Sequence, residues 1–445
     1  MHLYGTSRIN RHGRLEIGGV DTADLAERFG TPLYVVDEAL VRQRCREFMD
    51  AFRASGVPFE VSYASKAFCV KAIVRVVEEE GLALDVVSDG ELYTALEAGF
   101  PARRIHFHGN NKTPEEIAMG LEAGIGCFVV DNFTEIALLN AMAGERGIRA
   151  KALLRITPGV EAHTHEFIST GQEDSKFGFN LAGGAAFEAV KAAAEAPHLE
   201  LLGVHSHIGS QIFEVEGFRL AAEKVADFAA DVKKRLGVTF PVVNLGGGFG
   251  IRYVEGDLPL AVGEYVKAIT DAVKERFGAH GLEMPSIWIE PGRSIVGDAG
   301  TTLYTVGSVK DIPGVRKYVA VNGGMTDNPR PALYGAVYEA VIANRANDAP
   351  EEKVSIAGKC CESGDMLIWD VELPKVQTGD TLAVFCTGAY NYSMASNYNR
   401  LRRPAVVFVK DGEADLVVRR ETYEDLVSND VIPERLRKQP AVNGR

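Results

Sequence analysis

Reactive side chains directly follow short apolar runs near residue 66 and near residue 290. Lys66 ends the first of these runs. A lysine at such a position is either a solvated strand end or, inside a pocket, a desolvated amine whose pKa falls and which can form an imine with an aldehyde. Glu290 and Arg293 end the last run, with Gly292 between them. They form either a structural ion pair or a part of the same site.

Glycines and imidazoles supply two further groups. The triplet Gly246-Gly247-Gly248 is either a tight turn or a cup in which backbone N–H groups, helped by the dipole of a following helix, bind phosphate. Ser210 adds a hydroxyl to the same pocket. His205 and His207 are two residues apart, so both point to the same side of a strand. They are either a metal pair or a flat surface against an aromatic cofactor, and no partner at metal-ligand spacing supports a metal.

These groups together describe a site for pyridoxal phosphate. An imine-forming lysine, a phosphate cup, an imidazole and a carboxylate are what that cofactor requires of a protein. A carboxylate at the pyridine nitrogen keeps the nitrogen protonated and makes the ring a strong electron sink, which favours loss of carbon dioxide from an amino acid. A racemase benefits from the weaker sink that an arginine provides. The presence of Glu290 therefore favours a decarboxylase.

A regular alternation of β-branched runs and helical patterns is expected to position these groups. Eight strands, each followed by a helix, over about 230 residues predict an α/β protein built on a (β/α)₈ TIM barrel. An open doubly wound sheet shows the same alternation, but the first turn lacks a dinucleotide fingerprint. Barrel enzymes place their catalytic groups at the C-terminal ends of the strands. The predicted strands are Phe59–Ser65, Leu82–Val87, Ile105–His108, Cys127–Asp131, Lys151–Ile156, Leu202–Ser206, Val242–Leu245 and Ile287–Ile289.

The last third of the chain has a different texture. Strand patterns follow one another there with few long helical segments, and Gly-Asp and Asp-Gly pairs mark turns. We expect a barrel over 37–293 and a mostly β domain over 294–445, with an N-terminal segment 1–36 that joins the β domain through a strand at Leu33–Val36. The predicted strands of the β domain are Val306–Lys310, Tyr318–Val321, Thr381–Phe385 and Ala405–Val409.

Composition excludes several classes of protein. The 445 residues include 48 Lys and Arg against 61 Asp and Glu, a net charge of −13, and we find no basic cluster of the kind that nucleic acid requires. No apolar run is long enough to span a bilayer, and the N-terminus lacks the apolar core of a signal peptide. Six cysteines are too sparse for a disulfide framework. We therefore expect a cytoplasmic enzyme without nucleic-acid or membrane partners.

The chain resembles the diaminopimelate decarboxylases, within the alanine-racemase-like fold family that also holds ornithine and arginine decarboxylases. The resemblance covers nearly the whole chain and rests on specific motifs. The segment from His165 to Gly178 resembles the active-site loop of that family, although the sequence does not show whether the loop closes. The motifs are Tyr63-Ala64-Ser65-Lys66-Ala67, His207-Ile208-Gly209-Ser210, the glycine triplet, Glu290-Pro291-Gly292-Arg293, Cys361-Glu362-Ser363-Gly364-Asp365 and Gly388-Ala389-Tyr390.

The resemblance implies a role for each residue of these motifs. Lys66 would carry the cofactor, His207 would stack on its ring, and Glu290 would face the pyridine nitrogen. Cys361 would be the proton donor, and Cys361 with Glu362 would enter the site from the partner subunit of a homodimer. Cys360 has no implied role. The residues implied for the phosphate or its surroundings are Ser210, Gly247, Gly248, Gly292, Arg293 and Tyr390.

The substrate needs a separate argument because the relatives share the cofactor apparatus. A distal carboxylate, which diaminopimelate carries and ornithine lacks, is matched by a planar guanidinium. Arg330 and Tyr334 supply such a recogniser. The resemblance adds Arg293 and Tyr390 beside them and places Glu362 on the distal ammonium. The expected reaction is decarboxylation of meso-diaminopimelate to L-lysine, with ornithine, arginine or a carboxylated polyamine as the alternative substrates.

Overall fold

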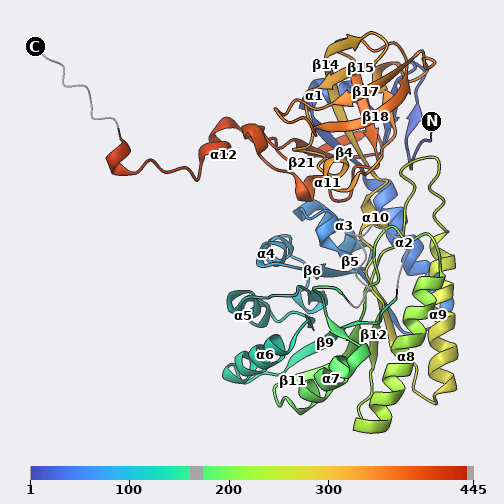
Figure 1. Ribbon diagram of the computed structural model, residues 1–445, viewed down its shortest axis with the longest axis vertical. Helices are drawn as coiled ribbons and strands as arrows, with labels where there is room; N and C mark the ends of the chain where they lie inside the picture. Colours follow the sequence, from blue (N-terminus) through green and yellow to red (C-terminus); the bar gives the residue numbers. More distant parts are fainter. Residues whose placement is uncertain (1, 161–173, 438–445) are drawn as a thin grey trace, which may run out of the picture.

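The computed structural model describes residues 2–160 and 174–437 and contains a barrel and a smaller β-rich region stacked along the long axis of the molecule (Figure 1). All eight predicted barrel strands are confirmed, each to within about three residues at its ends. They pair in parallel in chain order, and the pairs β8–β9 and β13–β5 complete the closed sheet. The barrel strands are β5 (Phe59–Ala64), β6 (Ala83–Val86), β7 (Ile105–Phe107), β8 (Cys127–Val130), β9 (Ala150–Thr157), β11 (Leu199–His205), β12 (Val242–Asn244) and β13 (Ser286–Ile289).

Helices cover the outside of the barrel, as the alternation in the sequence predicts. Their apolar residues face the sheet and their charged residues face solvent, the usual division on a surface helix. Thr113 caps α5 and forms a capping box with Glu116, so this helix begins where the sequence predicts. The barrel helices are α2 (Glu38–Ser55), α3 (Lys71–Glu79), α4 (Asp89–Glu97), α5 (Pro114–Ala123), α6 (Phe133–Glu145), α7 (Ala185–Glu195), α8 (Glu216–Leu236) and α9 (Val262–Ala279). The short α10 (Arg293–Val296) follows β13 and is wholly buried.

The β-rich region includes a strand from the N-terminal segment. Strand β4 (Leu33–Asp37) is wholly buried and lies between β14 (Gly300–Ile312), to which it pairs antiparallel, and β20 (Ala405–Lys410), to which it pairs in parallel. The predicted pairing of Leu33–Val36 with the C-terminal part is therefore confirmed. The same sheet contains β15 (Arg316–Val321), β16 (Ala340–Ile342), β17 (Glu352–Ala357), β18 (Met366–Leu373), β19 (Thr381–Phe385) and β21 (Glu413–Val418).

Strands β17, β18 and β21 were not predicted. Each carries charged residues and exposes part of its length, so its pattern is less regular than that of a strand buried on both faces. The remaining short elements are β1 (Arg8–Ile9), β2 (Leu15–Ile17), β3 (Val20–Asp21), α1 (Thr22–Phe29), β10 (Phe179–Asn180), α11 (Arg330–Tyr334) and α12 (Tyr423–Val427).

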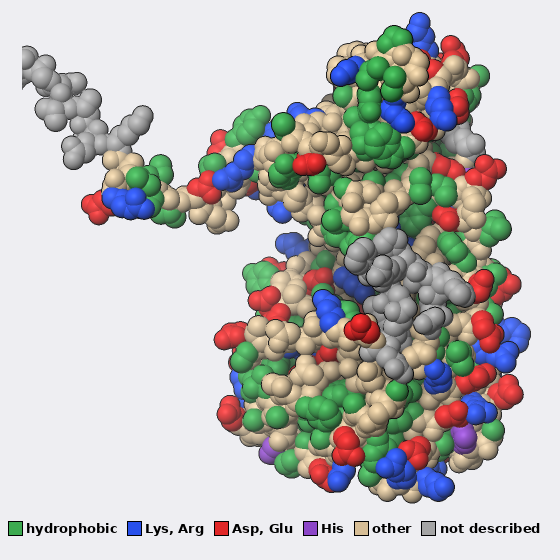
Figure 2. All heavy atoms as spheres, in the orientation of Figure 1, with side chains coloured by type: hydrophobic (Ala, Val, Ile, Leu, Met, Phe, Trp, Pro, Cys, Tyr) green, Lys and Arg blue, Asp and Glu red, His purple; other side chains and the backbone are tan. Residues whose placement is uncertain are grey.

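Segments of the β-rich region lie directly on the mouth of the barrel. The N–H of Tyr390 donates to the carbonyl of Ala67 at 2.8 Å, immediately after Lys66. Acidic and basic side chains are interspersed over the face of the molecule visible in Figure 2. None of the helices in the described ranges combines the length and apolar character needed to cross a membrane.

Candidate active site

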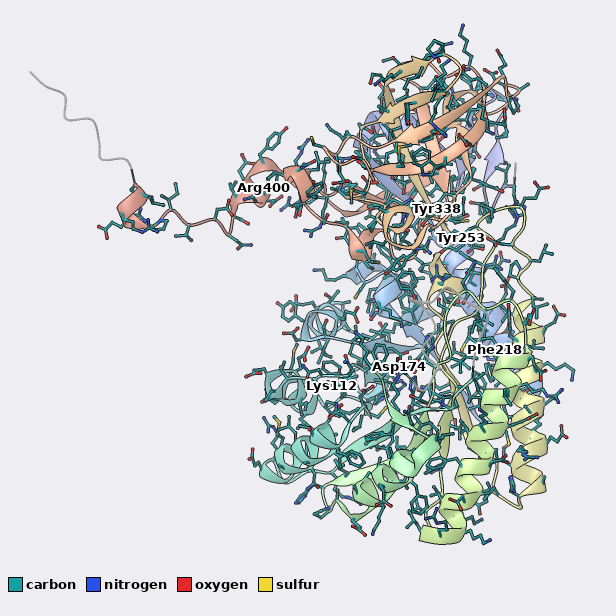
Figure 3. The ribbon with its side chains drawn as sticks, viewed as in Figure 1. Lys112, Asp174, Phe218, Tyr253, Tyr338 and Arg400 are labelled. Carbon is teal, nitrogen blue, oxygen red and sulfur yellow. The ribbon has the colours of Figure 1, made fainter. Side chains whose placement is uncertain are left out.

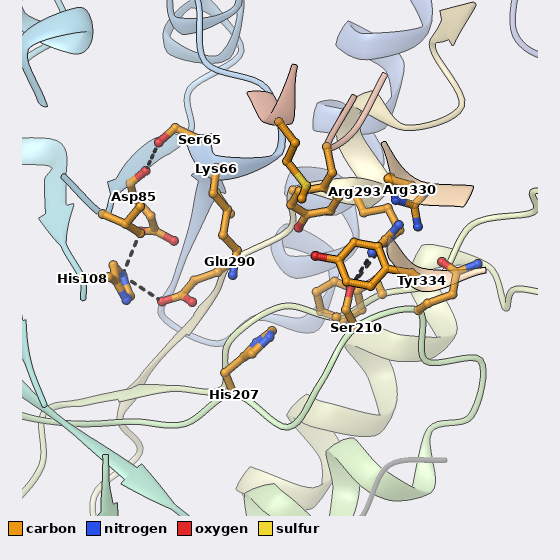
Figure 4. A pocket seen from close by; sticks show the side chains of 18 of the residues that line it. Ser65, Lys66, Asp85, His108, His207, Ser210, Glu290, Arg293, Arg330 and Tyr334 are labelled. Atoms are coloured by element: carbon orange, nitrogen blue, oxygen red, sulfur yellow. Dashed lines mark hydrogen bonds and ion pairs between the residues drawn. The ribbon is translucent and has the colours of Figure 1, made fainter. Parts of the chain in front are cut away.

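A cavity of about 760 Å³ lies between the barrel mouth and the β-rich region. Both parts of the chain line it, so neither forms the site alone. In Figure 4, Lys66 points into the cavity, with Glu290 and His108 on one side and Arg293, Arg330 and Tyr334 on the other. The predicted site residues that line it are Lys66, His207, Ser210, Gly248, Glu290, Gly292, Arg293, Arg330, Tyr334 and Tyr390.

Lys66 lies in a 3₁₀ turn, Ser65–Ala67, directly after β5. The preceding Ser65 is fully buried and donates to the Glu91 carboxylate at 3.0 Å, which anchors the turn to α4. The Lys66 side chain itself is exposed to the open cavity. Lys66 therefore lines the cavity directly after the end of β5.

Glu290 is a buried carboxylate held by donors from neighbouring strands. Asn244 Nδ2 donates to Oε1 at 2.6 Å, and His205 Nε2 lies 3.1 Å from Oε2. His108 Nε2 approaches Oε1 at 3.3 Å. Burial raises the pKa of Glu290, but the attraction of His205 and His108 outweighs it, so the pKa lies below the usual range of a glutamate. The carboxylate remains ionised at neutral pH.

The network continues beyond Glu290 toward the barrel interior. Asp85 Oδ1 lies 3.5 Å from His108 Nε2 and 3.3 Å from His106 Nδ1, and His106 Nε2 is 3.0 Å from Glu60. Burial lowers the pKa of His106, but its contacts with Asp85 and Glu60 raise it well above the ordinary value. Burial raises the pKa of Asp85, but the opposing effects of His108 and His106 are larger, so the pKa lies below the usual value of an aspartate. The pair Asp85–His106 is thus ionised at both members.

Sequence reasoning missed Asp85, Asn244 and the link from His108 to Glu290. Only the last residues of each predicted strand were considered as candidates, whereas Asp85 lies inside β6. A buried carboxylate within an apolar strand is costly in free energy unless it is paired. An aspartate inside such a strand therefore indicates a buried partner, and this was the signal that could have identified Asp85. Asn244 ends β12, two residues before the glycine triplet, and carries no motif of its own.

His205 and His207 have separate tasks. His205 is the last residue of β11, whereas His207 lies beyond the strand and its Nδ1 accepts the N–H of Gly247 at 3.2 Å. Burial lowers the pKa of His207 well below its usual value, and the charges of Lys66 and Arg155 lower it further, so the ring is neutral. The two histidines do not converge as a metal pair. Instead His205, His108 and Glu290 bring one ligand atom each within 4.8 Å, in the network described above.

The glycine triplet is mainly a tight turn. Gly246 and Gly248 have φ of 71° and 108°, and a Cβ at Gly247 would lie 2.1 Å from the carbonyl oxygen of Glu290. The N–H of Gly246 donates to Asn244 and that of Gly247 to His207. Only Gly248 of the three lines the cavity. The predicted cup is therefore reduced to Gly248, and the predicted helix dipole is wrong, because α9 begins only at Val262.

Two buried guanidiniums form the opposite side of the cavity. Arg293 donates through Nε and Nη2 to Ser210 Oγ at 3.3 and 3.0 Å and through Nη1 to the Tyr253 hydroxyl at 2.6 Å. Arg330 donates to the Tyr338 hydroxyl at 2.6 Å and lies 5.0 Å from the centre of the Tyr253 ring. Figure 3 shows Tyr253 and Tyr338 where the barrel meets the β-rich region.

No carboxylate of the described ranges forms an ion pair with Arg293 or Arg330, although both are less than 10% exposed. Buried guanidiniums require anionic partners or several hydrogen bonds. The arrangement is suited to anionic groups of a ligand. Of the two interpretations of Glu290 and Arg293, the structural ion pair is excluded, because Glu290 contacts Asn244 and Arg293 contacts Tyr253. Sequence reasoning also missed Tyr253, a residue in the long loop after the glycine triplet that carries no motif.

Three predicted residues do not line the cavity of their own chain. Gly247 is buried beneath it. Cys361 and Glu362 are exposed on the surface, in a turn before β18. Cys360 is buried, and burial together with the nearby Asp365 carboxylate raises the pKa of its thiol to about 12. The neighbouring cysteines thus differ in exposure and in their surroundings.

The predicted active-site loop is only partly described. Residues 161–173, which include most of the segment from His165 to Gly178, lie outside the described ranges. Lys176 and Phe177 line the cavity, and the Arg155 guanidinium lies 4.1 Å from the centre of the Phe177 ring. The end of this segment therefore belongs to the site.

Comparison with known proteins shows which family this site belongs to. Residues 38–297 match the family described as the pyridoxal-binding domain of pyridoxal-dependent decarboxylases. The chain is 63% identical over 431 residues to a diaminopimelate decarboxylase of Bacillus subtilis, covering 97% of this chain and 98% of the relative. The chain belongs to the diaminopimelate decarboxylase family of pyridoxal-dependent decarboxylases.

Further relatives agree. The chain is 48% identical to a diaminopimelate decarboxylase of Mycobacterium tuberculosis, with 93% of this chain and 94% of the relative covered. The crystal structure of the M. jannaschii diaminopimelate decarboxylase in complex with L-lysine superposes with a TM-score of 0.90 at 41% identity, covering 97% of this chain and 99% of that one. The predicted family and barrel fold are confirmed.

The residues of this pyridoxal-dependent decarboxylase fit its cofactor. Lys66 is an amine that reaches into the cavity, and the ionised Glu290 suits a protonated ring nitrogen. The neutral His207 ring has the flat, uncharged surface against which an aromatic cofactor packs. Two nitrogens of Arg293, Nε and Nη2, lie beside the Ser210 hydroxyl, and this combination of guanidinium and hydroxyl suits a phosphate.

The Asp85–His106 pair makes a prediction about pH. Asp85 has a lowered folded pKa, so its contribution to stability is present above the unfolded value of about 3.9 and is lost as the pH falls through the folded pKa. His106 has a raised folded pKa, so its contribution is present below about 6.5 and is lost as the pH rises through the folded pKa. Asp85→Asn should lower the free energy of unfolding by about 3 kcal/mol at pH 5–6.

The difference between wild type and Asp85→Asn should narrow as the pH falls below about 4, because the unfolded wild-type chain then binds a proton at Asp85 that the folded chain, with its lowered pKa, does not bind. Urea denaturation followed by circular dichroism at a series of pH values measures it. Asp50→Asn, at an exposed carboxylate, is the matched control and should show no loss. A difference that stays constant from pH 6 to pH 3 would contradict the assignment of an ionised Asp85.

Proposed function

We propose that the enzyme is a carboxy-lyase that decarboxylates meso-2,6-diaminopimelate to L-lysine and carbon dioxide, the last step of lysine biosynthesis. The observation that carries this proposal is the pair of buried guanidiniums, Arg293 and Arg330, without acidic partners in the described ranges. One suits the cofactor phosphate and leaves the other for a second anion. Diaminopimelate has a distal carboxylate to offer, whereas ornithine and arginine do not. The names of the relatives support the same substrate.

Recognition of the distal carboxylate falls to Arg330 and Tyr334. Arg330 begins α11 and Tyr334 ends it, so a single helical turn presents both to the cavity. The Tyr253 ring and the Tyr338 hydroxyl hold the Arg330 guanidinium in place. A held guanidinium loses little conformational entropy when it binds a carboxylate bidentately.

Pyridoxal phosphate, when bound, supplies an electron sink for the electron pair left at the α-carbon as carbon dioxide departs. Lys66 would hold the cofactor through its side-chain amine. Glu290 would hold the proton on the pyridine nitrogen, and Asn244 and His205 fix the position of its two oxygens. The neutral ring of His207 would pack on the cofactor ring, and the residues that would surround the phosphate are Ser210, Gly248, Gly292, Arg293 and Tyr390, all of which line the cavity.

The proton that replaces carbon dioxide comes from Cys361, and Glu362 binds the distal ammonium. Both residues are exposed and lie outside the cavity of their own chain. We infer that they act in the cavity of a second copy, so that the enzyme is a homodimer with shared active sites. The exposure of both side chains supports this inference, because it leaves them accessible to the cavity of a second copy.

The domain limits and location follow from the same reasoning. We propose that residues 1–36 and 294–445 form the β domain, that residues 37–293 form the cofactor-binding barrel, and that the enzyme works in the cytoplasm, where its free cysteines stay reduced.

The substrate is tested by assaying the purified holoenzyme with meso-diaminopimelate, L-ornithine, L-arginine and a carboxylated polyamine, with detection of carbon dioxide and the amine product. Only meso-diaminopimelate should give rapid turnover, with L-lysine as product. Arg330→Lys should lower kcat/KM for it about 10- to 100-fold, because charge-assisted hydrogen bonds are worth about 1.5–3 kcal/mol. Arg316→Lys, at a surface arginine of the β-rich region, is the control. Faster turnover of ornithine or arginine would favour the alternative substrates.

Sharing of the active sites is tested with hybrid dimers. Lys66→Ala should abolish covalent cofactor binding and turnover, and Cys361→Ala should lower kcat far more than cofactor affinity. Mixed after subunit exchange, the two inactive variants should regain up to about a quarter of wild-type activity, because half of the dimers are hybrids and each hybrid has one intact site. Absence of recovery, with exchange verified by two affinity tags, would show that each site is built from one chain.

A further inference from the structure

A buried carboxylate outside the cavity, Asp365, holds the turn that carries Cys361 and Glu362. Asp365 is 3% exposed, and its Oδ2 accepts the N–H of Cys360 at 2.8 Å. Its own N–H donates to the carbonyl of Glu362 at 3.1 Å. The two residues to which we assign roles in catalysis are therefore flanked on both sides by contacts with one residue.

The same carboxylate reaches a second loop. Asp365 Oδ1 accepts the N–H of Met325 at 2.6 Å, five residues before Arg330. Two glycines close over the carboxylate, because a Cβ would lie 2.4 Å from its oxygens at Gly324 and 2.2 Å at Gly358. The carboxylate thus fits tightly between the turn that carries Cys361 and the loop that leads to Arg330.

A second acceptor holds the turn from outside. The N–H of Cys361 donates to Asn399 Oδ1 at 2.7 Å. Asn399 is exposed and has φ of 51°, a left-handed conformation that asparagine tolerates better than most residues. Asp365 and Asn399 therefore accept hydrogen bonds from consecutive backbone N–H groups, those of Cys360 and Cys361.

We propose that Asp365 and Asn399 are positioning residues, which orient the Cys361–Glu362 turn for the partner's cavity. Asp365 also fixes the loop of Arg330 in its own cavity, so one carboxylate supports residues of both sites. The inference rests on the proposed roles of Cys361 and Glu362. A displacement of about 1 Å at a reacting group can lower a rate about 100-fold, so the orientation of this turn matters for turnover.

Asp365→Asn tests the buried contact with little change of volume. The amide group opposes one of the two backbone N–H donors, so one hydrogen bond is lost. We expect kcat to fall about 10- to 100-fold and KM for meso-diaminopimelate to rise. Asp370→Asn removes an exposed carboxylate of the same sheet that pairs with Arg316, and it should change neither constant.

Hybrid dimers with Lys66→Ala separate positioning from general destabilisation. In the hybrid, one site combines Lys66 of the Asp365→Asn chain with Cys361 of the chain whose Asp365 is intact. That site should regain a normal kcat per site, while its KM stays raised because its Arg330 belongs to the Asp365→Asn chain. General destabilisation of the Asp365→Asn chain would not produce this combination of a restored kcat and a raised KM.

Asn399 offers a test that does not disturb the interior. Asn399→Gly keeps the left-handed backbone but removes the acceptor, and kcat should fall about 2- to 10-fold, the effect of one lost hydrogen bond. Asn399→Asp keeps the acceptor and should retain kcat within about twofold. Unchanged kcat in both Asn399→Gly and folded Asp365→Asn would overturn the inference.

Failure of the shared-site proposal has a different result. Hybrids of Cys361→Ala and Lys66→Ala would then show no recovery, while loss of kcat in Asn399→Gly and its retention in Asn399→Asp would still support positioning of the turn. Failure of the shared-site proposal is therefore seen in the hybrids of Cys361→Ala and Lys66→Ala, whereas failure of the positioning inference is seen in Asn399→Gly and Asp365→Asn.

Discussion

The negative charge of Glu290 is the constraint on which the arrangement of the site depends. A buried carboxylate stays ionised only where donors and positive charge surround it. Asn244 and His205 supply these at the ends of β12 and β11, and His108 supplies a third contact just after β7. Side chains from three parts of the barrel can meet at one carboxylate because the closed sheet brings all strand ends to a single mouth. The closed barrel thus brings polar side chains from several strands together as well as supporting them.

The cavity divides by charge. Glu290 and its partners form one wall, and Arg293 and Arg330 form the other, with Lys66 between them (Figure 4). A carboxylate wall suits a protonated ring nitrogen, and a guanidinium wall suits phosphate and carboxylate. Tyr253 connects the two guanidiniums through its hydroxyl and its ring face without adding a charge of its own. Ligand anions are therefore not in competition with protein carboxylates of the described ranges at this wall.

The β-rich region supplies chemistry as well as cover. Arg330, Tyr334 and Tyr390 enter the cavity from it, and the Cys361 turn lies on its surface. Strand β4 makes this possible, because it ties the segment before the barrel into the sheet formed after it. The two ends of the barrel segment are thereby anchored in one sheet, which holds these residues at the mouth. Asp365 extends the same logic to the surface turn.

Much of this architecture was predictable because its causes are local. The eight barrel strands are short apolar runs, the helices carry their own caps such as Thr113, and Lys66 and Glu290 follow strands whose ends meet in any barrel. The combination of lysine, imidazole, glycines and carboxylate predicted the cofactor, and the family resemblance implied the role of each motif residue. Composition and spacing also excluded membrane and nucleic-acid classes without reference to the fold.

What remained depended on contacts between residues far apart in the chain. Gly246 and Gly247 have the flexibility for a phosphate cup, but their N–H groups are taken by Asn244 and His207, which no spacing rule predicts. Cys360 and Cys361 are identical in type and adjacent in sequence, and only burial beside Asp365 separates an inert thiol from an exposed one. Periodicity reports which face of an element is apolar, whereas the partner of each buried polar group is chosen by the packing of the whole chain.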